Sequence, residues 1–211
     1  MNQIDDFITQ LAQQPPPRRA GAHPFAISAN WLAYATSYFL IALWVSGVRP
    51  DLGVQLQRAE FVAELVLLFG LALTSSVSAA LLAFPDSFQK SAWTKLPLLL
   101  LLALLLTLLA AYLADNPPAP QPLHSWQCTM AIVMVAIIPG VWTLWVMRRF
   151  AAIQRGMAGS VAVLFAFSVS ALWLRLHELN DSISHVIYWH YLPMLIFAIV
   201  GWWLGKRVLR W

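Results

Sequence analysis

The chain has 211 residues, of which 60% are hydrophobic and only 10% are charged, and its mean hydropathy is +0.69. These values exclude a soluble domain with a water-facing surface and indicate an integral membrane protein. The net charge of +4 at pH 7 indicates membrane orientation and attraction to anionic lipid headgroups rather than nucleic-acid binding.

Residues 1–24 are predicted to form a short cytoplasmic amphipathic helix followed by a proline-rich linker. Pro15–Pro17 ends the helix and acts as a stiff spacer. A helix of about a dozen residues is marginal alone in water, so we expect a partner to order it. The alternative is that it lies on the lipid interface or docks on the bundle. Four apolar residues recur at i, i+3, i+4 and i+7 and form its partner-binding stripe: Ile4, Phe7, Ile8 and Leu11.

Six apolar segments follow, and each is long enough to qualify as a span, since roughly 18 residues are needed to cross about 30 Å of hydrocarbon. They predict an all-α fold, a bundle of six transmembrane helices that occupies residues 25–211. The connections between them are too short for a second soluble domain. The segments run Phe25–Gly47, Phe61–Phe84, Leu96–Tyr112, Cys128–Met147, Gly159–Leu176 and Val186–Gly205.

Basic residues are sorted unequally between the two sides of these spans. The side opposite the amino terminus carries three of the 13 Lys and Arg, namely Arg49, Arg58 and Arg175. The positive-inside rule therefore predicts a multi-pass membrane protein with both termini in the cytoplasm. The other ten lie on the side of the amino terminus: Arg18, Arg19, Lys90, Lys95, Arg148, Arg149, Arg155, Lys206, Arg207 and Arg210.

Two spans differ in what their composition predicts about packing. The third span is leucine-rich on all sides and is predicted to face lipid. The last span contains the small-xxx-small pair Gly201 and Gly205, which permits close helix contact. We expect this pair to pack inside the bundle, with dimerisation as the alternative.

Polar residues on the predicted outer side could bind a metal ion. Thiolate, imidazole and carboxylate ligands together suit a Zn or Cu ion at the periplasmic face. The spacing matches no recognised zinc signature, so ordinary loop and interface residues are the alternative interpretation. The sensing or metal candidates are His124 and Cys128 at the start of the fourth span, and His177, Glu178, Asp181 and His185 between the last two.

Glu64 and His190 are ionisable residues predicted to lie just inside the membrane edge. Ionisable groups within spans are functional candidates by default, although side chains this shallow can also reach water by snorkelling.

Enzymatic chemistry has little support in the sequence, and we predict that the protein is not an enzyme. Its single cysteine cannot form an intramolecular disulfide, and the chain has no HExxH, GxSxG or nucleotide-binding glycine loop. The leading interpretation is a binding regulator. A small transporter or channel accessory is the second interpretation, and a metal- or haem-dependent membrane oxidoreductase is the third.

Several motifs, in order, resemble the NrsF-like family of six-span bacterial anti-sigma factors, which are negative regulators of extracytoplasmic-function sigma factors. Cys128 stands ten residues before Ile138-Pro139 and twenty before Arg148-Arg149, like the family's first cysteine and following span. The other motifs are Gly47–Leu52 after the first span, and Trp189-His190, Pro193, Gly201, Gly205-Lys206-Arg207 and Leu209-Arg210-Trp211 at the carboxyl end.

The resemblance implies a multi-pass protein of the bacterial cytoplasmic membrane that sequesters such a sigma factor and releases it under stress. The apolar stripe of residues 4–11 would enter a groove on the sigma factor. The expected partners are therefore this sigma factor and membrane lipids, without direct nucleic-acid contact. Family members commonly carry a second cysteine after the fifth span, whereas Leu176–Asp181 occupies that place here. A ligand site within one chain would then need mixed nitrogen, oxygen and sulfur donors.

Overall fold

The computed structural model describes residues 23–85, 91–114 and 125–210, together with residues 4, 6, 8 and 9. These described residues form helices and connecting loops without a β-strand. Six helical segments are long and apolar enough to cross a membrane, in agreement with the predicted bundle. They are α2 (Pro24–Ser46), α4 (Ala59–Leu82), α5 (Ser91–Ala114), α6 (Trp126–Met147), α7 (Arg155–His177) and the continuous segment Ile183–Val208.

The last segment changes its helical type along its length. It begins as α8 (Ile183–Val186), continues as the π-helix η2 (Ile187–Tyr191) and ends as α9 (Leu192–Val208). A further short helix, α3 (Leu52–Gln55), lies between α2 and α4.

Several helices extend beyond the apolar segments that predicted them. Helix α7 begins at Arg155 rather than Gly159, and the last helical segment runs Ile183–Val208 rather than Val186–Gly205. The apolar run marks the part of a helix suited to hydrocarbon, while backbone hydrogen bonding continues for another turn through polar residues.

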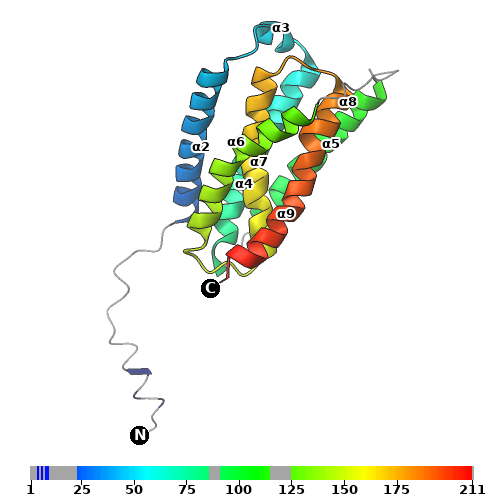
Figure 1. The fold of residues 1–211 in the computed structure, drawn as a ribbon. Coiled ribbons are helices and arrows are strands. Elements are labelled where there is room, and N and C mark those ends of the chain that lie inside the picture. The colour runs from blue at the N-terminus through cyan, green and yellow to red at the C-terminus, as the bar shows by residue number, and fades with distance from the viewer. Residues whose placement is uncertain are drawn as a thin grey trace.

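Helix α7 is the central element of the bundle and packs against α9, α4, α6 and α2 (Figure 1). Of its most apolar stretch, 78% of the residues are buried, against 17% for α5. Helix α5 lies at the rim on α4 and exposes six of its twelve leucines, as its uniformly apolar composition predicts.

The bundle has two distinct ends (Figure 1). Helix α2 begins and α9 finishes at one of them, called here the terminal end; α3 and the loop 178–182 lie at the other, called the distal end. Apolar side chains fill the interior in two clusters along α7. Trp31 and Phe165 belong to the cluster nearer the terminal end, and Leu104 and Ile132 to the distal one.

Helices α7 and α9 approach most closely where glycines face one another. A Cβ atom at Gly159 would lie 2.5 Å from the Cα of Gly205, and one at Gly201 would lie 2.8 Å from the carbonyl oxygen of Gly159. Ser160 Oγ donates a 2.5 Å hydrogen bond to the carbonyl of Ala198 on the facing helix. The structure therefore confirms that the small-residue pattern packs within the bundle.

Candidate functional site

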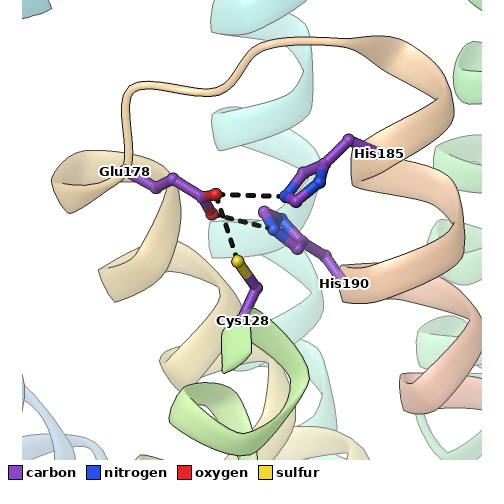
Figure 2. Close-up of side chains that lie close together, drawn as sticks. All are labelled: Cys128, Glu178, His185 and His190. Atoms are coloured by element: carbon purple, nitrogen blue, oxygen red, sulfur yellow. Dashed lines mark hydrogen bonds and ion pairs between the residues drawn. The ribbon is translucent and has the colours of Figure 1, made fainter. Parts of the chain in front are cut away.

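Four side chains with metal-ligating atoms meet at the distal end. Cys128 comes from the first turn of α6, Glu178 follows α7 directly, and His185 and His190 come from α8 and η2. Each offers one ligand atom, and these four atoms all lie within 4.8 Å of one another. Figure 2 shows the four side chains pointing toward a common centre.

The Glu178 carboxylate lies at the middle of this cluster. Cys128 Sγ donates to Glu178 Oε1 at 3.1 Å, His185 Nε2 lies 3.1 Å from the same oxygen, and His190 Nε2 lies 3.0 Å from Oε2 (Figure 2). The two imidazoles are almost fully buried, while the Glu178 side chain retains 17% exposure. The cluster is therefore largely enclosed, with slight access to solvent at the carboxylate.

The π-helix explains how two histidines five residues apart reach the same side. In an α-helix, five residues amount to roughly 500° of rotation, which leaves the two side chains about 140° apart. Hydrogen bonds from i to i+5 widen the turn of a π-helix, so residues five apart lie nearly above one another. Because η2 covers Ile187–Tyr191, His185 and His190 can both face Glu178.

Polar contacts with α6 hold this irregular segment in place. Ser125 Oγ shares a 3.2 Å hydrogen bond with His185 Nδ1, which turns Nε2 toward the cluster. One turn further along, Thr129 Oγ1 donates at 2.7 Å to the carbonyl of Trp189 within η2. These contacts hold the histidines against α6, and hence against Cys128.

The surroundings of Glu178 favour its ionised form. Burial alone would raise the pKa of its carboxyl, but the neighbouring His190, Cys128 and His185 outweigh burial and lower that pKa below its usual value. A carboxylate at the centre of the cluster is thus available to hold a proton donor or a cation.

Arg49 begins a network of ion pairs beside this cluster. Its Nε lies 2.8 Å from Asp51 Oδ1, its Nη2 lies 2.5 Å from Asp181 Oδ2, and its backbone N–H donates to the carbonyl of Leu176. Hydrogen bonds to Asp181 and Asp51 raise the pKa of Arg49 further above its usual value. Hydrogen bonds from Arg49 and then Gln55 lower the pKa of Asp51 well below its usual range. The network joins the connection after α2 to the loop after α7.

Arg175 carries the network into the bundle. Its Nη1 lies 3.1 Å from Asp181 Oδ1, its Nε lies 2.9 Å from Glu64 Oε1, and Tyr191 Oη donates to that same Glu64 oxygen. The guanidinium carbon lies 5.0 Å from the ring centroid of Phe61. Glu64, Arg175 and Asp181 also line an open cavity of about 390 Å³. Three helices, α4, α7 and η2, are therefore linked by buried polar contacts.

The structure brings together three of the predicted metal candidates and separates the others. Cys128, Glu178 and His185 meet. His177 instead has Nδ1 3.0 Å from the carbonyl of Gly47 and stacks on Trp173. Asp181 pairs with the arginines of the network, and His124 lies outside the described residues.

The two predicted membrane-edge residues lie in different environments. His190 is the fourth member of the cluster, and Glu64 pairs with Arg175 and Tyr191. Sequence reasoning did not single out Arg49, Arg175 or Tyr191 as site residues. The signal available for Arg175 was its position inside the predicted fifth span, where a cation needs a partner.

The predicted partner-binding stripe is described only in part. Ile4 and Ile8 are helical and highly exposed, at 68% and 57%. Phe7 and Leu11 lie outside the described residues.

Comparison with known proteins places the chain in a family. The family model described as "NrsF: Negative regulator of sigma F" matches residues 11–211. The chain belongs to the NrsF family. This family is named for negative regulation of a sigma factor, as the motif order in the sequence implied.

Two curated relatives resemble the chain over nearly its whole length. The anti-sigma-F factor NrsF of Caulobacter vibrioides is 25% identical, over 98% of this chain and 99% of the relative. The probable anti-sigma-F factor NrsF of Azospira oryzae is 28% identical, over the same shares. No solved structure matches the chain.

Proposed function

We propose that this protein is a membrane-bound anti-sigma factor of the bacterial cytoplasmic membrane. It sequesters an extracytoplasmic-function sigma factor and releases it when an envelope or periplasmic stress signal acts on the distal end. The observation that carries this proposal is the NrsF family match over residues 11–211, together with six helices suited to span a membrane. The family name supports a sigma factor as partner, and the helices support a membrane location.

Residues 4–11 supply the sigma-binding surface. Ile4 and Ile8 are exposed apolar side chains on one helical stripe, and exposed isoleucines of this kind suit the apolar groove of a protein partner. With the stripe in such a groove, the sigma factor is hidden from RNA polymerase by occupancy alone. No catalytic step is needed.

The terminal end faces the cytoplasm. Besides the excess of Lys and Arg on this side, the ammonium of Lys206 lies 3.4 Å from the ring centroid of Trp202, and the guanidinium of Arg149 lies 4.0 Å from that of Trp145. Paired cationic and aromatic side chains suit the headgroup region of an anionic leaflet. The distal end, with the Cys128 cluster, then faces the periplasm.

Release of the sigma factor requires that the signal favour a second arrangement of the bundle. A ligand shifts such an equilibrium only by its difference in affinity for the two states. A tenfold change in sigma affinity corresponds to about 1.4 kcal/mol of coupling between the sites. Metal ions and oxidants are the signals whose chemistry matches a distal end with a thiol and two imidazoles.

The test compares two substitutions on opposite sides of the amino-terminal helix. Ile8→Asp places a charge in the proposed groove and loses about 1.5–3 kcal/mol of apolar burial. We expect it to weaken co-purification of full-length protein with its cognate sigma factor by at least tenfold and to raise transcription from a sigma-dependent promoter. Asp6→Asn, on the other side of the helix, is the matched control. Equal binding by the Ile8→Asp variant and the wild type would contradict the proposal.

A further inference from the structure

The Cys128 cluster contains buried nitrogen atoms that lack hydrogen-bond partners. Nε2 of His185 and both ring nitrogens of His190 have none among the described residues, although the side chains are 2% and 0% exposed. Nε2 of each histidine lies at hydrogen-bond distance from a Glu178 oxygen, but the angles do not meet those of a hydrogen bond. Glu178 Oε2 likewise has no hydrogen-bond partner among the described residues. Buried polar groups are rarely left so, because each costs about 1–3 kcal/mol.

A metal ion would satisfy these atoms together. Zinc bonds to nitrogen, oxygen and sulfur are about 2.0–2.3 Å long, so the ligand atoms of a tetrahedral site lie roughly 3.3–3.8 Å apart. In the cluster, three pairs of side chains approach at 3.0–3.1 Å, and the greatest separation of ligand atoms is within 4.8 Å. Shifts of under about 1 Å would therefore form a four-coordinate site.

The ligand chemistry and charge favour Zn²⁺. Two imidazoles, a thiolate and a carboxylate form a borderline set, whereas Mg²⁺ and Ca²⁺ prefer oxygen alone and Cu(I) prefers sulfur. The Cys128 thiolate and the Glu178 carboxylate together carry two negative charges, which a divalent cation neutralises. A neutral complex is suited to a largely buried position, where an uncompensated charge is costly.

We propose that Cys128, Glu178, His185 and His190 form a four-coordinate Zn²⁺ site at the distal end. The Ser125 hydroxyl orients His185 from outside the ligand set, as second-shell groups do for zinc-bound imidazoles. Four protein ligands leave no open position for a substrate, so the site cross-links α6, the end of α7, α8 and η2 rather than catalysing a reaction. The Glu178 carboxylate thus supplies the second anionic ligand beside Cys128, a role that a second thiolate would have in a dithiol site.

Direct binding tests the site without any sigma factor. Full-length protein in detergent, stripped with a chelator, is dialysed against Zn²⁺ and analysed for metal content. We expect one Zn²⁺ per chain, undisturbed by excess Mg²⁺ or Ca²⁺. Cys128→Ser and His190→Gln should each weaken binding at least tenfold. His177→Gln is the matched control, because it removes an imidazole next to Glu178 that lies outside the cluster, and it should bind as the wild type does.

A second measurement needs no substitution and so does not depend on the folding of a variant. Zn²⁺ added to wild-type protein should slow maleimide modification of Cys128 at least tenfold, and Co²⁺ should give a thiolate-to-metal absorption band. Absence of stoichiometric Zn²⁺ binding by the wild type would overturn the proposal. Unchanged Cys128 modification, or an equal loss of binding in His177→Gln, would do the same.

Discussion

The two ends of the bundle achieve close packing by different means. At the distal end, charged and ligating side chains are buried and paired: the side chain of Arg49 is 0% exposed and that of Arg175 only 4%. Near the terminal end, α7 and α9 meet through glycine backbone, while Lys206 and Arg149 lie on the surface against tryptophan rings. Directional polar contacts therefore define the geometry of the distal end, and steric fit defines that of the terminal end.

The largest expected effect comes from breaking a buried ion pair of the distal network. Arg175→Met leaves Glu64 buried without its cation, and loss of one partner of such a pair costs about 3–5 kcal/mol. Thermal unfolding in detergent should show this destabilisation. Glu64→Gln combined with Arg175→Met should recover part of it, because the stranded charge is gone.

Arg58→Met is the control for this prediction, since Arg58 is exposed and its side chain hydrogen-bonds only Gln55, at 3.3 Å, among the described residues. If Arg175→Met destabilises the protein no more than Arg58→Met does, the ion pair is not a main support of the distal end.

At the terminal end, one methyl group added at Gly159 should disrupt the packing of α7 against α9. Gly159→Ala places a Cβ against the backbone of Gly205, which cannot move aside as a flexible side chain can. Overpacking typically costs about 1–3 kcal/mol, and a backbone obstacle favours the upper part of that range. Gly53→Ala is the control, because a Cβ there meets nothing within 4 Å. Equal unfolding temperatures for the two variants would contradict the close glycine contact.

The smallest expected effect is a loss of folding stability at acidic pH, caused by protonation of Asp51 at the exposed edge of the distal network. Arg49 lowers the pKa of Asp51, so the folded state binds the proton less tightly than the unfolded chain does. The stabilisation is present above the ordinary Asp pKa of about 3.9 and is lost progressively as the pH falls below it. Unfolding curves between about pH 6 and pH 2 should show that wild type and Asp51→Asn converge in acid. A difference in stability between the two proteins that does not change with pH would exclude the Arg49–Asp51 ion pair as the source of the acid dependence.

The spans and their helical type were predictable because each apolar segment must satisfy its own backbone hydrogen bonds in a membrane. The contact of Gly201 and Gly205 with a neighbouring helix was predictable for a similar reason, since small residues permit close approach. The choice of α7 as the partner required the fold, because the facing Gly159 is distant in sequence.

The candidate cluster was predictable in part. Cys128, Glu178 and His185 follow from residue type and the side of the membrane on which the spans place them. His190 was assigned to the membrane edge because it lies just inside the predicted last span. Regular α-helical spacing would point it away from His185, and the π-helix overrides that spacing. His177 and Asp181 were included among the metal candidates because they lie four residues apart, which would place them on one face of a helix. Helix α7 ends at His177, however, and the two side chains have different partners.

The π-helix η2 also sets the phase between the two ends of the last helical segment. An α-helix turns about 100° per residue, so one extra residue in a regular α-helix would rotate everything after it by about that angle. The wide turn over Ile187–Tyr191 absorbs that residue instead. Straightened into a regular α-helix at its full length, the segment could keep His185 in the cluster or Gly201 and Gly205 against α7, but not both.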